Sequence, residues 1–321
     1  MPGVLIRGEG VAAYTCAHLL DAAGNAVAVE AAGRPKLPAI LLGEPTQQLI
    51  CDVFDQPALF DGLPRIERRV VAWGADPVTV PHRAVVISET DLAARLRPAC
   101  LGEVAKPGWT IYAKRPLPAA CTEHEFGHRS ATVHKVSVKG DTAALWIESV
   151  ADGWLFLIPQ GWLLAVGAPA EELLARSQLV AAQIQGREDA GGRFAAHPRV
   201  VSPLCGPGWL GCGAAALSFD PICGDGTGYA IREGILAAAV IRAAERGEEA
   251  DGVRSHYAKR VVAAFSRHLE LCREYYRTGG SGPWWESELN ALEEGVAWCR
   301  AELGRETFQF RLNGFELERA G

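Results

Sequence analysis

Three glycines within five positions, Gly224, Gly226 and Gly228, precede a segment rich in Ala and Ile. Glycines at this spacing let a backbone approach a bound group closely. The segment that follows predicts a buried helix over 229–243, whose free N–H groups and positive dipole end would point at whatever lies over the loop. A phosphate or an electron-rich ring edge suits such a site. A tight turn before a core helix explains the same residues.

A second glycine-rich turn lies near the N-terminus, where residues 8–13 read G-E-G-V-A-A. The apolar run 4–6 precedes the turn, a helix is expected over 12–23, and a second strand is expected over 26–30. The pattern is therefore strand, helix, strand with G-x-G-x-x-A at the first turn. It predicts a dinucleotide-binding unit, with an ordinary strand–helix turn as the alternative.

Each residue of this motif has a physical role in dinucleotide binding. Gly8 forms the tight turn, Gly10 lets a pyrophosphate approach the backbone, and Ala13 permits close helix packing. Glu30, about 20 residues further on, would accept hydrogen bonds from ribose hydroxyls.

The elements between these two loops are read from periodicity and cap signals. We expect a helix capped by Thr46 and running to Phe54, strands within 64–82, and a helix over 89–100 capped by Ser88 or Thr90. Apolar alternation then predicts short strands at 109–113 and, from residue 128 to 167, an antiparallel sheet. The expected strands of that sheet are 131–138, 145–148, 153–159 and 162–167. A helix over 171–185 and a short strand over 209–213 follow.

The C-terminal part, from residue 252 onward, reads as helical, with a loop at 278–283 and an edge strand at 308–312. Its aromatic residues recur at helical spacing, which indicates core packing more often than a cofactor site. No internal repeat or low-complexity linker is visible.

Composition narrows the function classes. The 321 residues carry a formal net charge of -6, which argues against a nucleic-acid partner. No apolar run is long enough for a membrane span, and the N-terminus lacks a signal-peptide layout, so a cytoplasmic protein is expected. Nine cysteines without a C-x-x-C pair predict reduced, buried thiols and no metal site.

Four motifs occur in a fixed order along the chain. G-x-G-x-x-A with Glu30 comes first, followed by the pair Gly43-Glu44, the strand G-W-x-F-x-I-P at 153–159, and D-P-x-x-G-x-G at 220–226. In this order the chain resembles the flavoprotein monooxygenases of the p-hydroxybenzoate hydroxylase superfamily. Within it, the chain is similar to the branch of tryptophan-halogenase-like and geranylgeranyl-reductase-like proteins. The resemblance spans roughly residues 3 to 245.

The resemblance implies an α/β fold in which a Rossmann-type FAD-binding domain is interleaved with an antiparallel β-sheet substrate domain. The FAD-binding domain would comprise residues 1–60, 83–115 and 195–250, and the substrate domain 61–82 and 116–194. A mainly helical C-terminal region would occupy 251–321.

The resemblance also implies site residues. FAD would be held by Gly8, Gly10, Ala13, Glu30, Arg34, Gly43, Glu44, Asp220, Pro221, Gly224, Gly226, Thr227 and Gly228. An aromatic substrate would lie near Trp73, His128, His134, Trp154 and Phe156. His128 and His134 are acid–base candidates, although a hydrogen-bonded structural role is the commoner one for such histidines.

Three departures from the family pattern bear on function. Ala214 stands where the superfamily usually carries an Asp that binds the cofactor, and Lys114 follows Ala113 where a small or acidic residue is usual. The W-x-W-x-I-P signature of flavin halogenases is incomplete. Arg69 stands where those halogenases carry a catalytic lysine, and an arginine stays protonated, so halogenation is not expected.

The function that follows from the resemblance is an FAD-dependent monooxygenase. It would hydroxylate an electron-rich aromatic substrate, including a Trp or Tyr carried on a peptide or protein, through a flavin C4a-hydroperoxide. NAD(P)H or a separate flavin reductase would supply electrons. The alternatives are a flavoprotein-like binding scaffold with weak or no FAD binding, and an isoprenoid-type reductase. Arg83 and Arg129 would bind a carboxylate or pyrophosphate, or form surface ion pairs.

Overall fold

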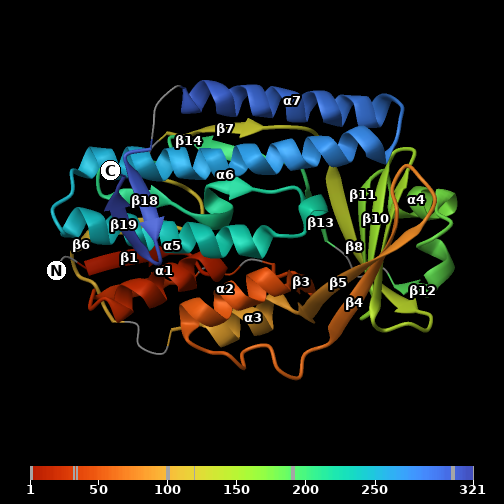
Figure 1. The fold of residues 1–321 in the computed structure, drawn as a ribbon, viewed down its shortest axis with the longest axis horizontal. Coiled ribbons are helices and arrows are strands. Elements are labelled where there is room, and N and C mark those ends of the chain that lie inside the picture. Colours follow the sequence, from red (N-terminus) through yellow and green to blue (C-terminus); the bar gives the residue numbers. More distant parts are fainter. Residues whose placement is uncertain are drawn as a thin grey trace.

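The computed structural model describes residues 3–31, 33, 35–98, 102–118, 120–188, 192–304 and 308–320. Figure 1 shows a five-stranded sheet with its helices at one end of the molecule and a nine-stranded sheet at the other, while two long C-terminal helices lie along both. This is the expected α/β architecture. The domain boundaries given above remain a prediction.

The five-stranded sheet has the order β15-β16-β6-β1-β2. Four of its strands are parallel, and the short β15 is antiparallel to β16. Helix α1 crosses from β1 to β2, which is the expected strand–helix–strand unit. The bounds are β1 Gly3–Arg7, α1 Val11–Ala22, β2 Val27–Glu30, β6 Pro107–Tyr112, β15 Cys205–Gly206 and β16 Trp209–Gly211.

Helix α5 (Gly226–Glu245) packs closely on α1. A Cβ at Gly234 would lie 2.6 Å from the carbonyl oxygen of Ala12, so glycine is required for this approach. The central residues of α5 are buried on nearly every side, because Ala and Ile dominate them. The long Ala-rich helix predicted after the Gly-rich loop is thereby confirmed, although it starts three residues earlier.

The nine-stranded sheet has the order β12-β8-β11-β10-β9-β4-β5-β3, with β13 also paired to β8. Its pairs are antiparallel except for β4 with β9. Helix α4 packs on one face against Leu155 and Leu157, while Trp154 and Phe156 of the same strand belong to the main core on the other face. The bounds are β3 Ile40–Gly43, β4 Arg65–Ala72, β5 Val78–Ile87, β8 Ser130–Val138, β9 Ala144–Val150, β10 Gly153–Ile158, β11 Trp162–Gly167, α4 Ala170–Arg176, β12 Ile184–Glu188 and β13 Arg193–Ala195.

The C-terminal helices α6 (Ala250–Gly279) and α7 (Pro283–Leu303) form an antiparallel hairpin joined at the expected glycine-rich loop. Figure 1 shows them lying side by side along the length of the molecule. The remaining elements are α2 Glu44–Phe54, α3 Glu89–Leu96, β7 Thr122–Glu125, β14 Arg199–Ser202, β17 Leu217–Ser218, β18 Phe310–Asn313 and β19 Glu316–Arg319. No helix in the described ranges is both long and apolar enough to cross a membrane.

The helix expected over 171–185 is wrong. Helix α4 ends at Arg176, a short 3₁₀ turn covers Ala181–Gln183, and β12 follows. The carboxylate of Glu148 accepts hydrogen bonds from the backbone N–H groups of residues 178–180 and from the Ser177 hydroxyl. These contacts replace helical hydrogen bonds, so the helix stops where the carboxylate of a neighbouring strand binds the backbone.

Two helix boundaries also differ from expectation. Helix α2 begins at Glu44 after Gly43, so Thr46 is inside its first turn and is not the cap, as suits the proline at position 45. Helix α3 ends at Leu96 because Arg97, which precedes Pro98, takes an extended conformation. Its predicted Ser88 cap is confirmed, since the hydroxyl accepts a hydrogen bond from Asp91 N at 3.0 Å.

The edge strand β18 begins at Phe310, and its partner β19 was missed.

Candidate functional site

The start of α1 leaves free backbone N–H groups beside a sharp turn. Gly8 and Gly10 have φ angles of 115° and 120°, which disfavour any residue with a side chain. A Cβ at Gly8 would also lie 2.8 Å from the backbone of Ala113 and Lys114. Gly10 caps α1 without a side-chain hydrogen bond, and the first turn holds no acidic residue. The helix start can therefore bind an anionic group.

The other residues predicted for the dinucleotide lie around this turn. Ala13 is buried in α1, and Glu30 lies exposed at the end of β2, where its backbone oxygen accepts a hydrogen bond from Gly8 N at 2.9 Å. The Glu30 carboxylate is 3.3 Å from Arg7 Nε. The placement beside the Gly8 turn fits a ribose contact. Arg34 lies outside the described residues.

The start of α5 offers a second uncapped helix end. The loop contains the 3₁₀ turn Pro221–Cys223, and Gly224 has a φ of 65°. A Cβ placed at Gly224 or Gly226 would meet no protein atom within 4 Å, so the space over the loop is open. Asp225 precedes the helix but makes no capping hydrogen bond. The backbone N–H groups at the start of α5 therefore receive no side-chain cap and remain available to a ligand.

Helix α2 joins this second site through a side-chain contact. Thr46 donates a hydrogen bond to Asp225 Oδ1 at 2.7 Å, which fixes the start of α2 beside the start of α5. Gly43 and Glu44, predicted to contact the cofactor, stand at that start. Glu44 is exposed and lies 3.6 Å from Arg83, so the surface ion pair was the correct alternative for Arg83.

The spacing of the two helix ends defines the shape of a ligand that could contact both. Gly234 of α5 lies against Ala12 in the first turn of α1. The start of α5 at Gly226 is eight residues earlier, which corresponds to about 12 Å of helix. One elongated ligand could therefore contact both helix starts, with an anionic group at the start of α1. FAD is a ligand of this shape. A Cβ built at Gly224 or Gly226 would meet no protein atom within 4 Å, so the space over the α5 loop is open to it.

A buried ion network lies directly beneath the loop. Arg129 is 2% exposed and donates to Asp220 Oδ2 at 2.6 Å, and its Nη1 donates to Glu288 of α7. Glu288 also accepts a hydrogen bond from the backbone N of His128 at 3.1 Å. The surface ion pair considered for Arg129 is therefore wrong. Asp220 was predicted to bind the cofactor. Its carboxylate instead accepts hydrogen bonds from protein donors, and these bonds hold the loop in position.

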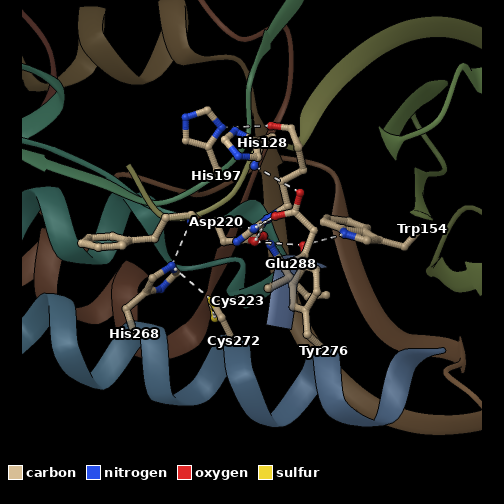
Figure 2. A network of polar contacts seen from close by, with 12 residues as sticks. His128, Trp154, His197, Asp220, Cys223, His268, Cys272, Tyr276 and Glu288 are labelled. Atoms are coloured by element: carbon tan, nitrogen blue, oxygen red, sulfur yellow. Dashed lines mark hydrogen bonds and ion pairs between the residues drawn. The ribbon is translucent and has the colours of Figure 1, made fainter. Parts of the chain in front are cut away.

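Helix α6 completes the network from below, as Figure 2 shows. Tyr276 donates to Asp220 Oδ2 at 3.0 Å and accepts from the indole of Trp154 at 3.2 Å. About two helical turns earlier on the same face of α6, His268 Nε2 accepts a hydrogen bond from the backbone N–H of Asp220 at 2.9 Å. Burial raises the pKa of Tyr276 well above its ordinary value, so the hydroxyl stays protonated. Arg129 and α6 thus hold the loop directly, while α7 and β10 support them through Glu288 and Trp154.

The predicted substrate residues are only partly gathered. Trp73 and Trp154 pack edge to face with ring centroids 6.3 Å apart, and Phe156 shares the same sheet face as Trp154. Trp154 is only 2% exposed. His134 bonds to Thr132 at 3.0 Å, the structural role described above, and the side chain of His128 is exposed. Their role in substrate binding remains a prediction.

A buried acid lies next to Ala214. Glu233 of α5 is 6% exposed, and its carboxylate accepts a hydrogen bond from Gly213 N at 2.7 Å. Burial raises the pKa of Glu233 to about 7. Ala214 itself is exposed and brings no charge. A carboxyl group is therefore present within one residue of the position where the family pattern places one, but it comes from a helix.

A surface cleft of about 680 Å³ lies at the turn end of the nine-stranded sheet. It is lined by Gly74, Glu148, Gly280 and their neighbours and includes none of the predicted site residues. The Glu148 carboxylate already binds backbone N–H groups. The cleft therefore does not coincide with the cofactor and substrate residues predicted from the sequence.

Sequence reasoning missed most of the network. Residues 129, 233, 268, 272, 276 and 288 were not assigned to the site or were assigned differently. The i, i+4, i+8 spacing of His268, Cys272 and Tyr276 was a visible signal, because it places these side chains on one helix face. The partners of Arg129 lie 91 and 159 residues away, so no local pattern could reveal them.

Comparisons with known proteins address the fold. No protein-family model matches the chain, and no curated protein matches it in sequence. The solved structure of QhpG, a peptidyl tryptophan dihydroxylase essential for tryptophylquinone cofactor biogenesis, aligns with a TM-score of 0.75 over 99% of this chain and 86% of that chain at 18% identity. The flavin-dependent halogenase CmlS aligns with a TM-score of 0.73 over 92% and 70% of the two chains at 15% identity.

PqsL, a probable FAD-dependent monooxygenase from Pseudomonas aeruginosa, aligns with a TM-score of 0.66 over 94% of this chain and 99% of that chain at 14% identity. At such identities the likeness concerns the fold. The sequence motifs and the three alignments agree: this chain has the fold of the flavin-dependent monooxygenases and halogenases.

Proposed function

We propose that this protein is an FAD-dependent monooxygenase acting on an electron-rich aromatic group. The observation that carries the proposal is the pair of helix starts, at α1 and α5, that lack a side-chain cap, together with the open space over Gly224 and Gly226. The start of α1 would hold the pyrophosphate, and Glu30 the adenosine ribose. The loop from Pro221 to Gly228 would lie along the edge of the flavin ring.

FAD, when bound, would supply the activation of O₂ that an amino-acid side chain cannot provide. The residues of the chain would bind, orient and exclude water. The N–H groups at the start of α5 would stabilise negative charge on the ring edge. Arg129, Asp220 and Tyr276 would keep the loop in place while charge on the ring changes.

An aromatic substrate is supported by the partly buried rings of Trp73 and Phe156, which pack against the main core beside Trp154. Within that class we propose a Trp or Tyr carried on a peptide or protein. QhpG, whose fold this chain shares, is a peptidyl tryptophan dihydroxylase. Electrons would come from NAD(P)H or from a separate flavin reductase.

The first experiment measures bound flavin. Protein purified with added FAD should show the visible absorption bands of a flavin and a Kd that titration can determine. The variant Gly226→Leu should weaken FAD binding at least about tenfold, or about 1.4 kcal/mol. A Cβ at residue 226 meets no protein atom within 4 Å, so we expect the fold to be unaffected while the leucine side chain fills the ligand space.

Gly186→Leu is the matched control, because a Cβ at Gly186 in β12 also meets no protein atom. It should leave the FAD affinity unchanged. Equal affinity of both variants would show that FAD does not lie over the α5 loop. Colourless protein that takes up no FAD would overturn the proposal.

A binding scaffold without redox chemistry is the second candidate, because Ala214 removes a carboxylate that the family pattern supplies. The visible absorption spectrum of protein purified with FAD separates the scaffold from the monooxygenase, since a scaffold that binds no FAD would remain colourless. For coloured protein, O₂ uptake by the photoreduced enzyme with aromatic peptides separates a monooxygenase from an isoprenoid-type reductase. A monooxygenase should consume O₂ and release a hydroxylated peptide in equal amounts.

A further inference from the structure

Two cysteines from distant parts of the chain meet beside the loop of the proposed flavin site. Cys223 ends the 3₁₀ turn before Gly224, and Cys272 lies in the C-terminal half of α6. Their Sγ atoms are 3.5 Å apart, and both are free thiols. Figure 2 shows them below Asp220, next to His268. A disulfide requires an S–S distance of about 2.05 Å, so a shift of about 1.5 Å would join them.

The two thiols are chemically unlike. Cys223 is half-buried, and the hydrogen bond from Cys272 lowers the pKa of its thiol below the ordinary value. Cys272 is fully buried, and burial raises the pKa of its thiol well above the ordinary value. Cys223, the half-buried residue with the lowered thiol pKa, is therefore the more reactive of the two toward a solvent-borne reagent, while Cys272 is the buried thiol beside it. This division of roles is that of an attacking and a resolving cysteine.

His268 lies close enough to form a three-residue metal site with the two cysteines, since their ligand atoms are all within 4.8 Å of one another. Its Nε2 already accepts the backbone N–H of Asp220 at 2.9 Å. Nε2 is also the ring nitrogen that lies 3.3 Å from Cys272 Sγ, and a metal ion bound to it would have to displace the hydrogen bond from Asp220, because this nitrogen has one lone pair in the ring plane. The described residues provide no fourth ligand to this group. The geometry therefore favours thiol chemistry over metal binding.

We propose that Cys223 and Cys272 form a redox-active dithiol that reacts with hydrogen peroxide, Cys223 attacking and Cys272 resolving. The Cys223 thiolate attacks one peroxide oxygen, the O–O bond breaks, and hydroxide leaves, so Cys223 becomes a sulfenic acid. The Cys272 thiol then attacks this sulfur, the S–O bond breaks, and water leaves as the disulfide forms. In total, two thiols and one hydrogen peroxide give one disulfide and two water molecules.

The disulfide would covalently join the loop to α6. The reduced protein holds this loop through two hydrogen bonds of Asp220, whose backbone N–H donates to His268 Nε2 and whose carboxylate accepts from the Tyr276 hydroxyl. Oxidation would add a bond three residues after Asp220 and next to Gly224. If the proposed function holds, the dithiol lies beside the FAD ring and would react with peroxide released there. The dithiol chemistry itself does not require FAD.

The test uses the full-length protein treated with stoichiometric hydrogen peroxide, whether or not it carries flavin. Mass spectrometry should find a loss of two hydrogens and a cross-link between the peptides that contain Cys223 and Cys272, both reversed by dithiothreitol. Cys272→Ser should accumulate a sulfenic acid at residue 223 that dimedone labels. Cys223→Ser should block the cross-link and the dimedone labelling. Circular dichroism of each variant checks its fold.

Cys299→Ser is the matched control, because Cys299 is another buried thiol of the C-terminal helices. This variant should form the cross-link to the same extent as the unchanged protein. Absence of the cross-link in folded, unchanged protein would overturn the proposal. Co-purification of about one zinc ion per chain, lost in both Cys223→Ser and Cys272→Ser, would also overturn it in favour of a metal site. Colourless protein would reject the proposed function alone, because peroxide is added directly.

Discussion

Removal of the Arg129 charge tests whether the buried ion network holds the loop and the C-terminal helices together. In Arg129→Met the carboxylates of Asp220 and Glu288 stay buried without their cation. Breaking one partner out of a buried ion pair costs about 3–5 kcal/mol, because an uncompensated charge remains out of water. With a urea slope of about 3 kcal/mol per molar, the unfolding midpoint should fall by about 1 to 1.7 M.

The assay is equilibrium urea unfolding followed by tryptophan fluorescence, since Trp154 donates to Tyr276 within the network. Arg68→Met is the matched control, because Arg68 pairs with Asp141 and both side chains are about 40% exposed. An exposed ion pair contributes about 0–1 kcal/mol, so this control should move the midpoint little.

A rescue variant separates lost charge from lost packing. Adding Asp220→Asn and Glu288→Gln to Arg129→Met removes the two buried charges that have lost their cation. The urea unfolding midpoint of this triple variant should therefore lie between those of Arg129→Met and the unchanged protein. Our reasoning is refuted if Arg129→Met loses no more stability than Arg68→Met. It is also refuted if the rescue variant is less stable than Arg129→Met alone, because packing and hydrogen bonds would then outweigh the charge.

Two further predictions concern single buried positions. Burial raises the pKa of Glu233 to about 7, so the folded state keeps a proton that the unfolded chain releases near pH 4.5. The free energy of unfolding should therefore fall by up to about 3 kcal/mol as the pH rises from about 4.5 to 7. Urea unfolding midpoints measured across this pH range should show the fall in the unchanged protein and a smaller one in Glu233→Gln. Parallel curves for the two proteins would contradict the assignment. Gly127 and Gly140 both have positive φ, but only at Gly127 would a Cβ collide with Glu288 Oε2, at 2.2 Å. Gly127→Ala should thus destabilise more than Gly140→Ala, which carries only backbone strain of about 1–3 kcal/mol; equal thermal midpoints would argue against a tight fit at Gly127.

The glycine motifs were readable because their constraints are local. A positive φ at Gly8 and Gly10, followed by an Ala-rich helix, depends on neighbouring residues alone, and the structure has this turn at the predicted place. The same holds for the Gly224–Gly228 loop and α5. Alternating apolar residues likewise predicted most strands of the antiparallel sheet, because side chains alternate between faces.

Predictions failed where a distant side chain replaced local hydrogen bonds. Residues 178–180 carry no helix breaker, yet their N–H groups bind Glu148 from a strand about thirty residues earlier. The family resemblance gave no residue of the C-terminal quarter a role. The structure nevertheless joins α6 to the loop through Tyr276, and α7 to Arg129, the cation that holds the loop, through Glu288.

The sequence by itself determined the α/β class, the two glycine loops and the order of motifs, because these depend on residues close together in the chain. Only the tertiary structure decided what surrounds those loops. It joined Arg129 to Asp220 and Glu288, placed Cys223 against Cys272, and brought Glu233 next to Ala214. Buried charges and thiols acquire their chemistry from partners brought close by packing, and contacts across tens to more than a hundred residues leave no periodic trace in a single sequence.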